Sequence, residues 1–382
     1  MNVDGKHFRT VWVDKDEQPI VKIIDQTKLP FAFEIENLDS VESLVSAIKN
    51  MHVRGAGCIG VTAAYGMWLA ANQSRGSYSQ LESLASKILE ARPTATNLSW
   101  AVKRQLDLVA KNKNENWITL TLNEANKISD EDARWCNEIG NHGKKILYDI
   151  AKNKNNSSPV NILTHCNAGW LAFADWGSAT SPIYCAHREG LSVHVWVDET
   201  RPLNQGARLT SWELANEGVP HTIIPDNTGG HLMRSGMVDV VITGTDRTNS
   251  YGDVANKIGT YLKALAATDN GIPFYVALPS STFDWDTAEG GGDIPIEQRD
   301  SDEVMNIEGL NSEGKISSIA VSLDSFNYAN YAFDVTPSRL VSGLITERGI
   351  CNASRDGIMG LFPEKINNYC TFVDLFMLIY SV

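Results

Sequence analysis

The 382-residue sequence contains no apolar run close to the roughly 20 residues that a membrane-spanning helix requires. Its first ten residues, MNVDGKHFRT, lack the apolar stretch of a secretory signal peptide. We therefore expect no membrane association. We expect a cytoplasmic location, with an additional nuclear pool as an alternative.

Positive charge and paired cysteines are also scarce. The chain has 33 Lys and Arg against 46 Asp and Glu, a net charge of -13, which argues against a nucleic-acid partner. The six cysteines form no CxxC pair and no zinc-type spacing with histidine, so neither a disulfide scaffold nor a metal site is expected. No G-x-G-x-x-G or Walker sequence follows a predicted strand, and we expect no cofactor.

What is present is the composition of a globular protein, 43% hydrophobic and long enough for two domains. Short alternating stretches in residues 1–40 predict a small antiparallel sheet. From Val41 the apolar residues recur with helical spacing. Further helices are predicted at 59–73, 78–90, 97–112 and 121–152. Residues 1–152 are therefore predicted to form a mostly helical N-terminal domain.

The second half has a different pattern. After a polar segment at 152–159, which is typical of a linker, short β-rich runs alternate with helical stretches. This alternation predicts an α/β fold with a parallel sheet in a second domain, 153–382. Strands are expected near 161–165, 194–198, 221–225, 239–243 and 273–278. The Gly-rich, acidic stretch 290–304 is predicted to be a surface loop.

Polar and Gly-rich strings follow these predicted strands: THCNAG, DETRP, DNTGGH, GTDRTNSYGD and PSSTFD. Ligands of open α/β sheets bind outside the carboxyl ends of the strands. Five such ends on one rim indicate a ligand site. The alternative is that these residues only make turns.

Two of these ends carry reactive side chains. Cys166 follows a predicted strand, between His165 and Asn167, where neighbouring cations can tune a thiol; the alternative is a packed core cysteine. Asp246 ends another strand, and partial burial there would raise its pKa and suit acid–base work. The alternative for Asp246 is a helix cap or a salt bridge with Arg247.

Two further segments have the features of an anion site. Asn256 and Lys257 are predicted to open the helix that runs through IGTYLKALAA, and a helix N-terminus with a lysine in its first turn suits phosphate. Lys257 on a solvated helix face is the alternative. Arg54 lies in the Gly-rich turn MHVRGAGCIG, where backbone amides and a guanidinium can bind an oxyanion. Short Gly-rich turns are common, so this signal alone is weak.

Six longer strings carry a family resemblance: MHVRGAGCIGVTAAYG, RPTATNL, ILTHCNAGWLA, VDETRPLNQGARLTSWEL, HLMRSGMVDVVITGTDR and GDVANKIGTYLKALAATDNGIPFYVALPSST. Together they resemble the S-methyl-5-thioribose-1-phosphate isomerase family of methionine salvage, within the superfamily of the eIF2B α/β/δ regulatory subunits. The resemblance extends from about residue 10 to Ile350. It implies a small, mostly helical N-terminal domain followed by a Rossmann-like domain, and a homodimer formed through the second domain.

The resemblance also implies site residues. Cys166 and Asp246 would be the catalytic pair. The implied substrate-binding residues are Arg54, Gly55, Ala56, Arg92, Gln205, Asn256 and Lys257. Gly57, Cys58 and Trp170 depart from the family pattern, and we expect them to reshape the pocket wall around the 5-substituent of the sugar.

The implied reaction converts 5-methylthioribose 1-phosphate to 5-methylthioribulose 1-phosphate, with Asp246 protonating the ring oxygen and Cys166 supporting the transition state or relaying a proton. The substrate is thus a small sugar phosphate. Three alternatives stay open: a ribose-1,5-bisphosphate isomerase, a non-catalytic eIF2B-type regulatory subunit, and a generic nucleotide-binding α/β protein.

Overall fold

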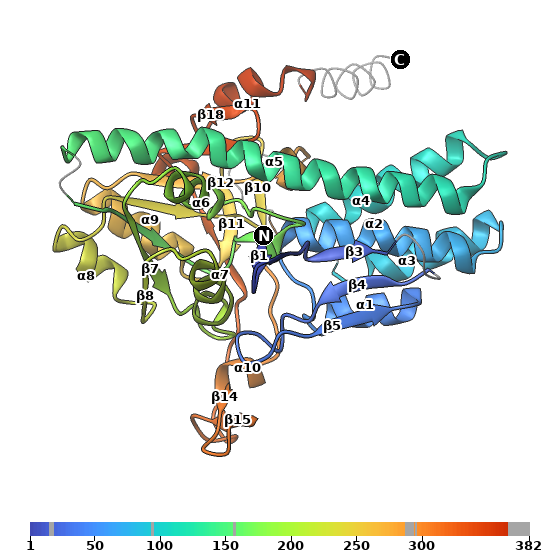
Figure 1. The fold of residues 1–382 in the computed structure, drawn as a ribbon, viewed down its shortest axis with the longest axis horizontal. Coiled ribbons are helices and arrows are strands. Elements are labelled where there is room, and N and C mark those ends of the chain that lie inside the picture. The colour runs from blue at the N-terminus through green and yellow to red at the C-terminus, as the bar shows by residue number, and fades with distance from the viewer. Residues whose placement is uncertain (15–18, 93–94, 156–157, 287–293, 295, 366–382) are drawn as a thin grey trace, which may run out of the picture.

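The computed structural model describes residues 1–14, 19–92, 95–155, 158–286, 294 and 296–365. It shows a mixed α/β protein with two lobes, one helical and one built on a large sheet (Figure 1). Within the described residues, no helix has both the length and the hydrophobicity needed to cross a bilayer.

The first lobe combines a small sheet with a helical bundle. Its antiparallel sheet, in the order β3-β4-β5, confirms the predicted N-terminal sheet. These strands are Val11–Val13, Val21–Ile24 and Ile35–Leu38. The helices are α1 (Val41–Lys49), α2 (Ala56–Gln73), α3 (Tyr78–Leu89), α4 (Thr96–Lys111) and α5 (Trp117–Asn153). All of the predicted helices are present, and α2 is buried on every side from Gly57 to Ala71 because α1, α3, α4 and α5 surround it.

Helix α5 belongs to both lobes. It runs along one edge of the whole molecule (Figure 1) and is amphipathic throughout. Ala125 and Ile128 lie in the hydrophobic core of the first lobe, whereas Ile139 and Leu147 lie in the core beneath the large sheet. The predicted linker begins within the last turn of this helix, and residues 156 and 157 of it lie outside the described part of the chain.

The second lobe is built on a seven-stranded sheet in the order β18-β17-β12-β9-β6-β7-β8. All neighbouring strands are parallel except β17 and β18. The strands are β6 (Val160–Thr164), β7 (Val193–Asp198), β8 (His221–Ile224), β9 (Val240–Thr243), β12 (Phe274–Ala277), β17 (Gly343–Thr346) and β18 (Gly349–Cys351). Five of these were predicted and are confirmed within one or two residues. Helices α6 (Ser181–Arg188), α7 (Ser211–Asn216), α8 (Gly229–Arg234), α9 (Thr260–Asp269) and α11 (Arg355–Leu361) accompany the sheet.

The strand order reverses beside β6. From β6 the chain continues outward through β7 and β8, whereas β9, β12 and β17 build the sheet in the opposite direction. Such a reversal opens a crevice between the loops at the carboxyl ends of two neighbouring strands, here β6 and β9. The topology therefore places a natural binding crevice next to Cys166 and Asp246.

A second, four-stranded sheet in the order β13-β10-β11-β16 lies beside this crevice. Its strands are β10 (Arg247–Asn249), β11 (Val254–Lys257), β13 (Phe283–Asp284) and β16 (Phe333–Thr336). The prediction that Asn256 and Lys257 open a helix is wrong. They end β11, where they pair with Asp334 and Phe333 of β16, and α9 begins only after Gly259, which takes a φ of 102°.

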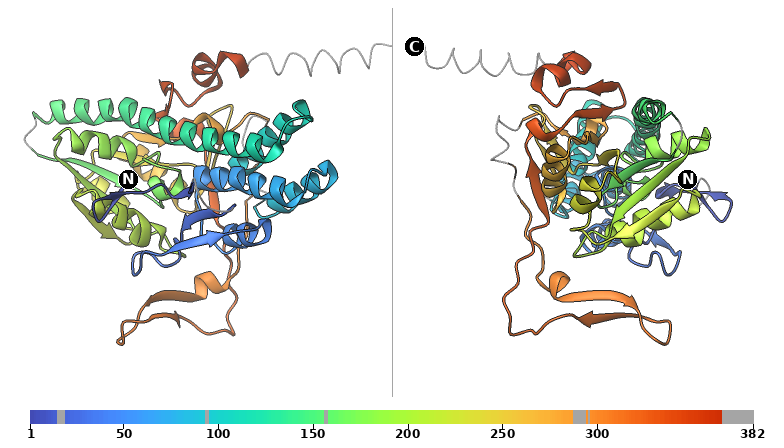
Figure 2. Two further views of the ribbon diagram at one scale, coloured as in Figure 1. Left: turned by 45° about the vertical axis from the view of Figure 1, so that its right-hand side comes forward. Right: turned by 90° about the vertical axis from the view of Figure 1, so that its left-hand side faces the viewer.

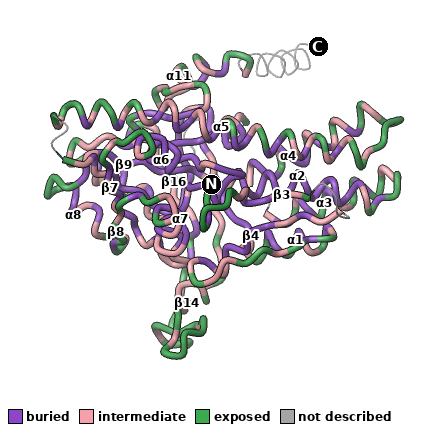
Figure 3. The backbone as a smooth tube through the Cα atoms, viewed as in Figure 1, coloured by how far each residue is buried: buried purple, intermediate pink, exposed green. Residues whose placement is uncertain are grey.

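The segment predicted as an acidic surface loop is more structured than expected. Residues 287–293 and 295 lie outside the described part, but Ile294 is only 6% exposed. The chain then passes through α10 (Asp302–Met305) into a hairpin of β14 (Asn306–Leu310) and β15 (Ile316–Ala320). This hairpin projects away from the body (Figure 2), and most of its residues are exposed (Figure 3).

Candidate active site

Cys166 and Asp246 lie after the adjacent strands β6 and β9, at the crevice where the strand order reverses. Cys166 has a φ of 64°, an unfavourable conformation for a residue with a side chain. Two threonines hold it there: the Cys166 N–H donates to Thr200 Oγ1 (2.8 Å), and Thr210 Oγ1 donates to the Cys166 carbonyl (2.7 Å). Backbone strain that is held in this way is common at functional sites.

Arg54 reaches this loop from the first lobe. Its guanidinium donates to Asn167 Oδ1 (2.7 Å) and to the Asn167 carbonyl (2.9 Å), and its Nη2 lies 4.0 Å from Cys166 Sγ. Gly55 follows with a φ of 87°, and a Cβ there would lie 2.4 Å from that of Ala172. Glycine is therefore required for the turn that brings Arg54 and the start of α2 against the second lobe.

Burial dominates the electrostatics of Cys166. It raises the pKa of the thiol, and the nearby charges of Arg54 and Lys257 only partly oppose this effect. The thiol is thus held protonated rather than activated as a thiolate. It is therefore suited to donating a hydrogen bond or a proton.

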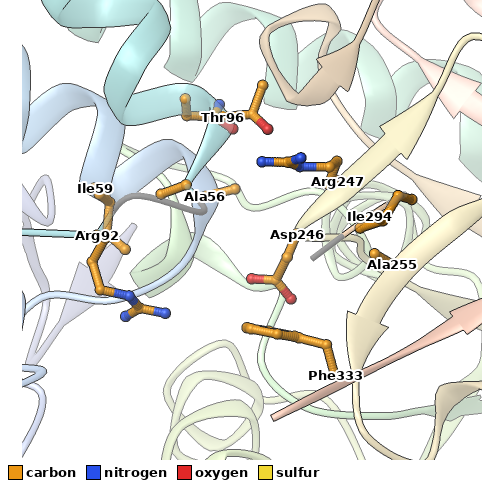
Figure 4. Close-up of a pocket in the computed structure, with 11 residues that line it drawn as sticks. Ala56, Ile59, Arg92, Thr96, Asp246, Arg247, Ala255, Ile294 and Phe333 are labelled. Atoms are coloured by element: carbon orange, nitrogen blue, oxygen red, sulfur yellow. The ribbon is translucent and has the colours of Figure 1, made fainter. Parts of the chain in front are cut away.

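Asp246 points into a pocket between Arg92 and Phe333 (Figure 4). Its carboxyl group makes no hydrogen bond to any described residue, and burial raises its pKa while Lys257 and Arg54 oppose the rise. With a raised pKa, the carboxyl group keeps its proton up to a higher pH than an ordinary aspartate does, as a general acid requires.

Lys257 interacts electrostatically with both catalytic candidates, Cys166 and Asp246. Its side chain is 6% exposed, with Nζ 4.8 Å from the ring centre of Phe333. Burial lowers its pKa, and the charges of Cys166 and Asp246 oppose that shift. The three ionisable groups therefore act on one another within a single site.

The other predicted binding residues lie around the same crevice. Ala56 and Arg92 line the pocket of Asp246, whereas Gln205 lines an adjoining hollow with Arg54. Gln205 is 3% exposed, and its Oε1 is buried without a partner in the described structure. Asn256 instead donates from Nδ2 to Thr260 Oγ1 (3.0 Å). The predicted residues thus come from both lobes and from four different loops or strands.

Sequence reasoning missed a buried carboxylate behind this site. Glu213 accepts hydrogen bonds from Asn167 Nδ2 (2.8 Å), the Trp170 N–H (2.9 Å) and the Tyr184 hydroxyl (2.9 Å). Burial raises its pKa to about 7. A Cβ at Gly169 would lie 1.8 Å from its Oε2, so only glycine fits there. In the sequence, Glu213 is part of the string LTSWEL, which resembles the ordinary start of a helix and therefore did not indicate a buried carboxylate.

Trp170 was expected to reshape the pocket wall, and this expectation is wrong. Its side chain is fully buried in the core beneath the sheet, with its ring centre 6.0 Å from that of Trp212. It does not line the pocket of Asp246. Gly57 also faces inward, because a Cβ there would lie 2.2 Å from the ring of Phe173.

One cluster in the crevice has metal-ligand chemistry: His165, Asp198 and Asp226. His165 Nδ1 lies 2.8 Å from Asp198 Oδ2, and the Lys263 ammonium lies 3.1 Å from the same oxygen. Since a resident ammonium already neutralises this carboxylate, the cluster is an internal ion network and its donor set does not favour a metal.

Comparisons with known proteins agree with this geometry. Residues 52–353 match the model of the Initiation factor 2 subunit family. A curated methylthioribose-1-phosphate isomerase of Desulfatibacillum aliphaticivorans is 54% identical over 96% of this chain and all of its own length. One of the same name from Escherichia coli is 52% identical over 95% of this chain and 97% of its own.

Solved structures show the same likeness. The 5-methylthioribose 1-phosphate isomerase of Pyrococcus horikoshii has a TM-score of 0.80 and 37% identity, covering 94% of this chain and 96% of its own. A structure described as subunit delta of eIF-2B from A. fulgidus has a TM-score of 0.75 and 36% identity, covering 93% and 99%. The chain therefore belongs to the Initiation factor 2 subunit family and, within it, to the methylthioribose-1-phosphate isomerases.

Proposed function

We propose that this chain isomerises 5-methylthioribose 1-phosphate to 5-methylthioribulose 1-phosphate. One observation carries the proposal: Cys166 and Asp246 follow adjacent strands at the reversal of the sheet, and the buried cations Arg54 and Lys257 act on both. Curated relatives that match nearly the whole chain bear the name of this activity.

The cations are suited to the phosphate group. Among the described residues, Arg54 is bonded to the neutral side chain of Asn167 and Lys257 forms no ion pair with a carboxylate. Neither cation would therefore have to leave a carboxylate partner in order to bind a phosphate dianion. The orphaned Gln205 Oε1 adds an acceptor for a sugar hydroxyl.

The chemistry begins at the ring. Phosphate on the anomeric oxygen prevents spontaneous ring opening, so a group must protonate the ring oxygen as the C1–O bond breaks. Protonated Asp246 supplies that proton. Hydrogen then moves from C2 to C1 while the C2 hydroxyl passes its proton to the Asp246 carboxylate, which restores the acid, and C2 becomes the ketone. The neutral thiol of Cys166 supports this step by donating a hydrogen bond or relaying the proton.

The pocket wall favours a methylthio group over a second phosphate. Beside Asp246 the wall is apolar and built by Ile59, Ala95, Ala255, Ile294 and Phe333. Arg247, at the edge of this wall, is bonded to Asp284 (3.1 Å). A 5-phosphate would therefore meet apolar carbon and a cation whose charge is already balanced.

A coupled assay tests the proposal. Purified protein is given either 5-methylthioribose 1-phosphate or ribose 1,5-bisphosphate, and ketose formation is followed with Asp246→Asn as the control. We expect turnover of the methylthio substrate alone. Preference for the bisphosphate would support the alternative isomerase, and no turnover of either would support a regulatory subunit.

We further propose a cytoplasmic homodimer formed through the second lobe. The resemblance to the isomerase family supports this. Analytical ultracentrifugation at micromolar concentration tests it, and a sedimentation coefficient of the monomer would reject it.

A further inference from the structure

The segment predicted as a surface loop carries Glu297 into the crevice. Its carboxylate lies between two arginines: Arg92 Nη2 donates to Oε2 and Arg299 Nη1 donates to Oε1, each at 3.1 Å. Arg92 belongs to the first lobe, in the connection between α3 and α4, whereas Arg299 precedes α10. One carboxylate therefore joins the two sides of the crevice.

This bridge is anchored from behind. Arg299 also donates through Nη2 (2.6 Å) and Nε (2.9 Å) to Glu303, and Asn330 Nδ2 donates to the other oxygen of Glu303 (2.8 Å). The backbone of Glu297 is fixed by the Ala332 N–H, which donates to its carbonyl (2.9 Å). Since Ala332 leads directly into β16, the bridge is built on the same small sheet that carries Lys257.

Arg92 has donors that this bridge leaves unused. Its Nη1 meets only the weakly accepting sulfur of Met51 (3.3 Å), and its buried Nε has no acceptor in the described structure. A buried donor without an acceptor is costly, and at a ligand site it indicates a missing acceptor. Glu297 thus holds one side of the guanidinium while other donors stay available.

Glu297 and its two arginine partners interact with the residues of the proposed active site. Arg299 lines the hollow that contains Arg54 and Gln205, whereas Arg92 lines the pocket of Asp246. The charge of Glu297 raises the pKa of Asp246, and the charge of Arg299 lowers that of Lys257. Glu297 therefore connects the pocket of Asp246 with the hollow that contains Arg54 and Gln205.

We propose that Glu297 is a positioning residue for phosphate recognition, which orients Arg92 toward the phosphate group of the substrate by holding it and Arg299 on its two carboxylate oxygens. This inference rests on the proposed function for the identity of the substrate. Without the carboxylate, the two guanidinium groups repel each other and Arg92 loses its orientation. Glu297 itself need not touch the substrate.

The test is a double-substitution cycle of Glu297→Gln with Arg92→Ala, read as the KM and kcat for the sugar phosphate and as the dissociation constant of inorganic phosphate by calorimetry. Glu297→Gln is expected to raise both KM and the phosphate constant roughly tenfold. kcat should stay within about twofold, because Glu297 acts before the chemical step. In the Arg92→Ala background the same change should have almost no effect.

Two further variants sharpen the reading. Glu297→Asp keeps the charge and should recover part of the affinity. Glu124→Gln is the matched control, because Glu124 is a similarly shielded carboxylate bonded to Arg104 far from the crevice, and it should leave KM unchanged. Thermal unfolding of each variant confirms that the fold is retained.

An unchanged or lower KM, a loss confined to kcat, or an equal effect of Glu297→Gln with and without Arg92 would each overturn the proposal. Failure of the wild-type chain to bind phosphate would overturn it as well. The phosphate titration needs no turnover, so a chain that bound phosphate but did not isomerise the methylthio substrate would disprove the proposed function and still decide the role of Glu297.

Discussion

Arg54 and Asn167 are joined by two hydrogen bonds, one to the side-chain oxygen (2.7 Å) and one to the backbone carbonyl (2.9 Å), across the boundary between the lobes. Asn167 is in turn fixed by Glu213 and Thr210. The position of the Arg54 guanidinium is therefore fixed by Asn167, the residue that directly follows Cys166. A substrate bound at Arg54 would be aligned with the thiol without any movement of the loop.

This relationship predicts the effect of Asn167→Ala. The variant removes the 2.7 Å bond but leaves the one to the carbonyl, so Arg54 loses orientation rather than its place. A hydrogen bond to a charged group contributes about 1.5–3 kcal/mol, so kcat/KM should fall roughly 10- to 150-fold. Asn270→Ala, which removes only a bond to a helix carbonyl, is the control in steady-state assays. Equal activity of the two variants would contradict the role of Asn167.

Asp246→Asn should abolish most of the turnover and preserve binding. The amide has nearly the same shape but no transferable proton, and general acid catalysis contributes about 10²–10⁴-fold. kcat should fall by that order, while the dissociation constant of the sugar phosphate, measured by calorimetry, changes little. A kcat near that of the wild type would exclude Asp246 as the acid.

Cys166→Ser should be severely impaired in kcat, because a hydroxyl is a much weaker acid than a thiol. Cys185 provides a matched control, since it is also a buried, free cysteine but packs between α5 and α6. Cys185→Ser should lose some stability and keep its activity. If both variants retain normal turnover on folded protein, Cys166 is a packing residue.

Lys257→Ala should weaken capture of the substrate, because it removes a buried cation from the proposed phosphate site. The expected rise in KM is about 10- to 150-fold, with the chain still folded. Lys315→Ala, at an exposed position beyond the crevice, should leave KM unchanged. An unaltered KM in Lys257→Ala would rule out the phosphate role.

Asp132 predicts a pH-dependent stability. Burial raises its pKa from 3.8 to about 7, although the Ala174 N–H donates to it at 2.6 Å. The folded state therefore holds this proton more tightly than the unfolded state, and between about pH 4 and 7 stability falls as pH rises, by up to about 1.4 kcal/mol per pH unit. Asp132→Asn should remove this contribution, as urea unfolding across that range would show. An unchanged slope would contradict the shift.

Much of the architecture could be predicted from sequence because the signals were local. Four buried parallel strands, β6, β7, β9 and β12, are short apolar runs and were found, as was the edge strand β8. The strands β16 and β17 were missed because each has only four residues, with Pro337 directly after β16 and Gly343 at the start of β17. Lys257 was assigned to a helix because a short strand directly before a helix has no periodicity of its own.

The two catalytic candidates were the clearest sequence signals because each is a reactive residue that follows a predicted strand. Cys166 follows β6 and Asp246 follows β9. Glu213 and Glu297 gave no such signal, because their significance lies in partners that are distant in the chain. Glu297 lies 205 residues from Arg92, in a segment whose acidic composition is typical of solvent-exposed loops. Composition describes an average environment and does not report such pairings.

Helix α5 has a consequence for how the protein unfolds. Its two halves complete two different hydrophobic cores, and an unbroken helix transmits the loss of one core to the other. The lobes are therefore expected to melt together, as one cooperative unit. Separate expression of either half would cut this helix or leave one of its faces bare, so a fragment would be prone to aggregate. The two lobes that form the walls of the crevice are thus expected to unfold in one transition.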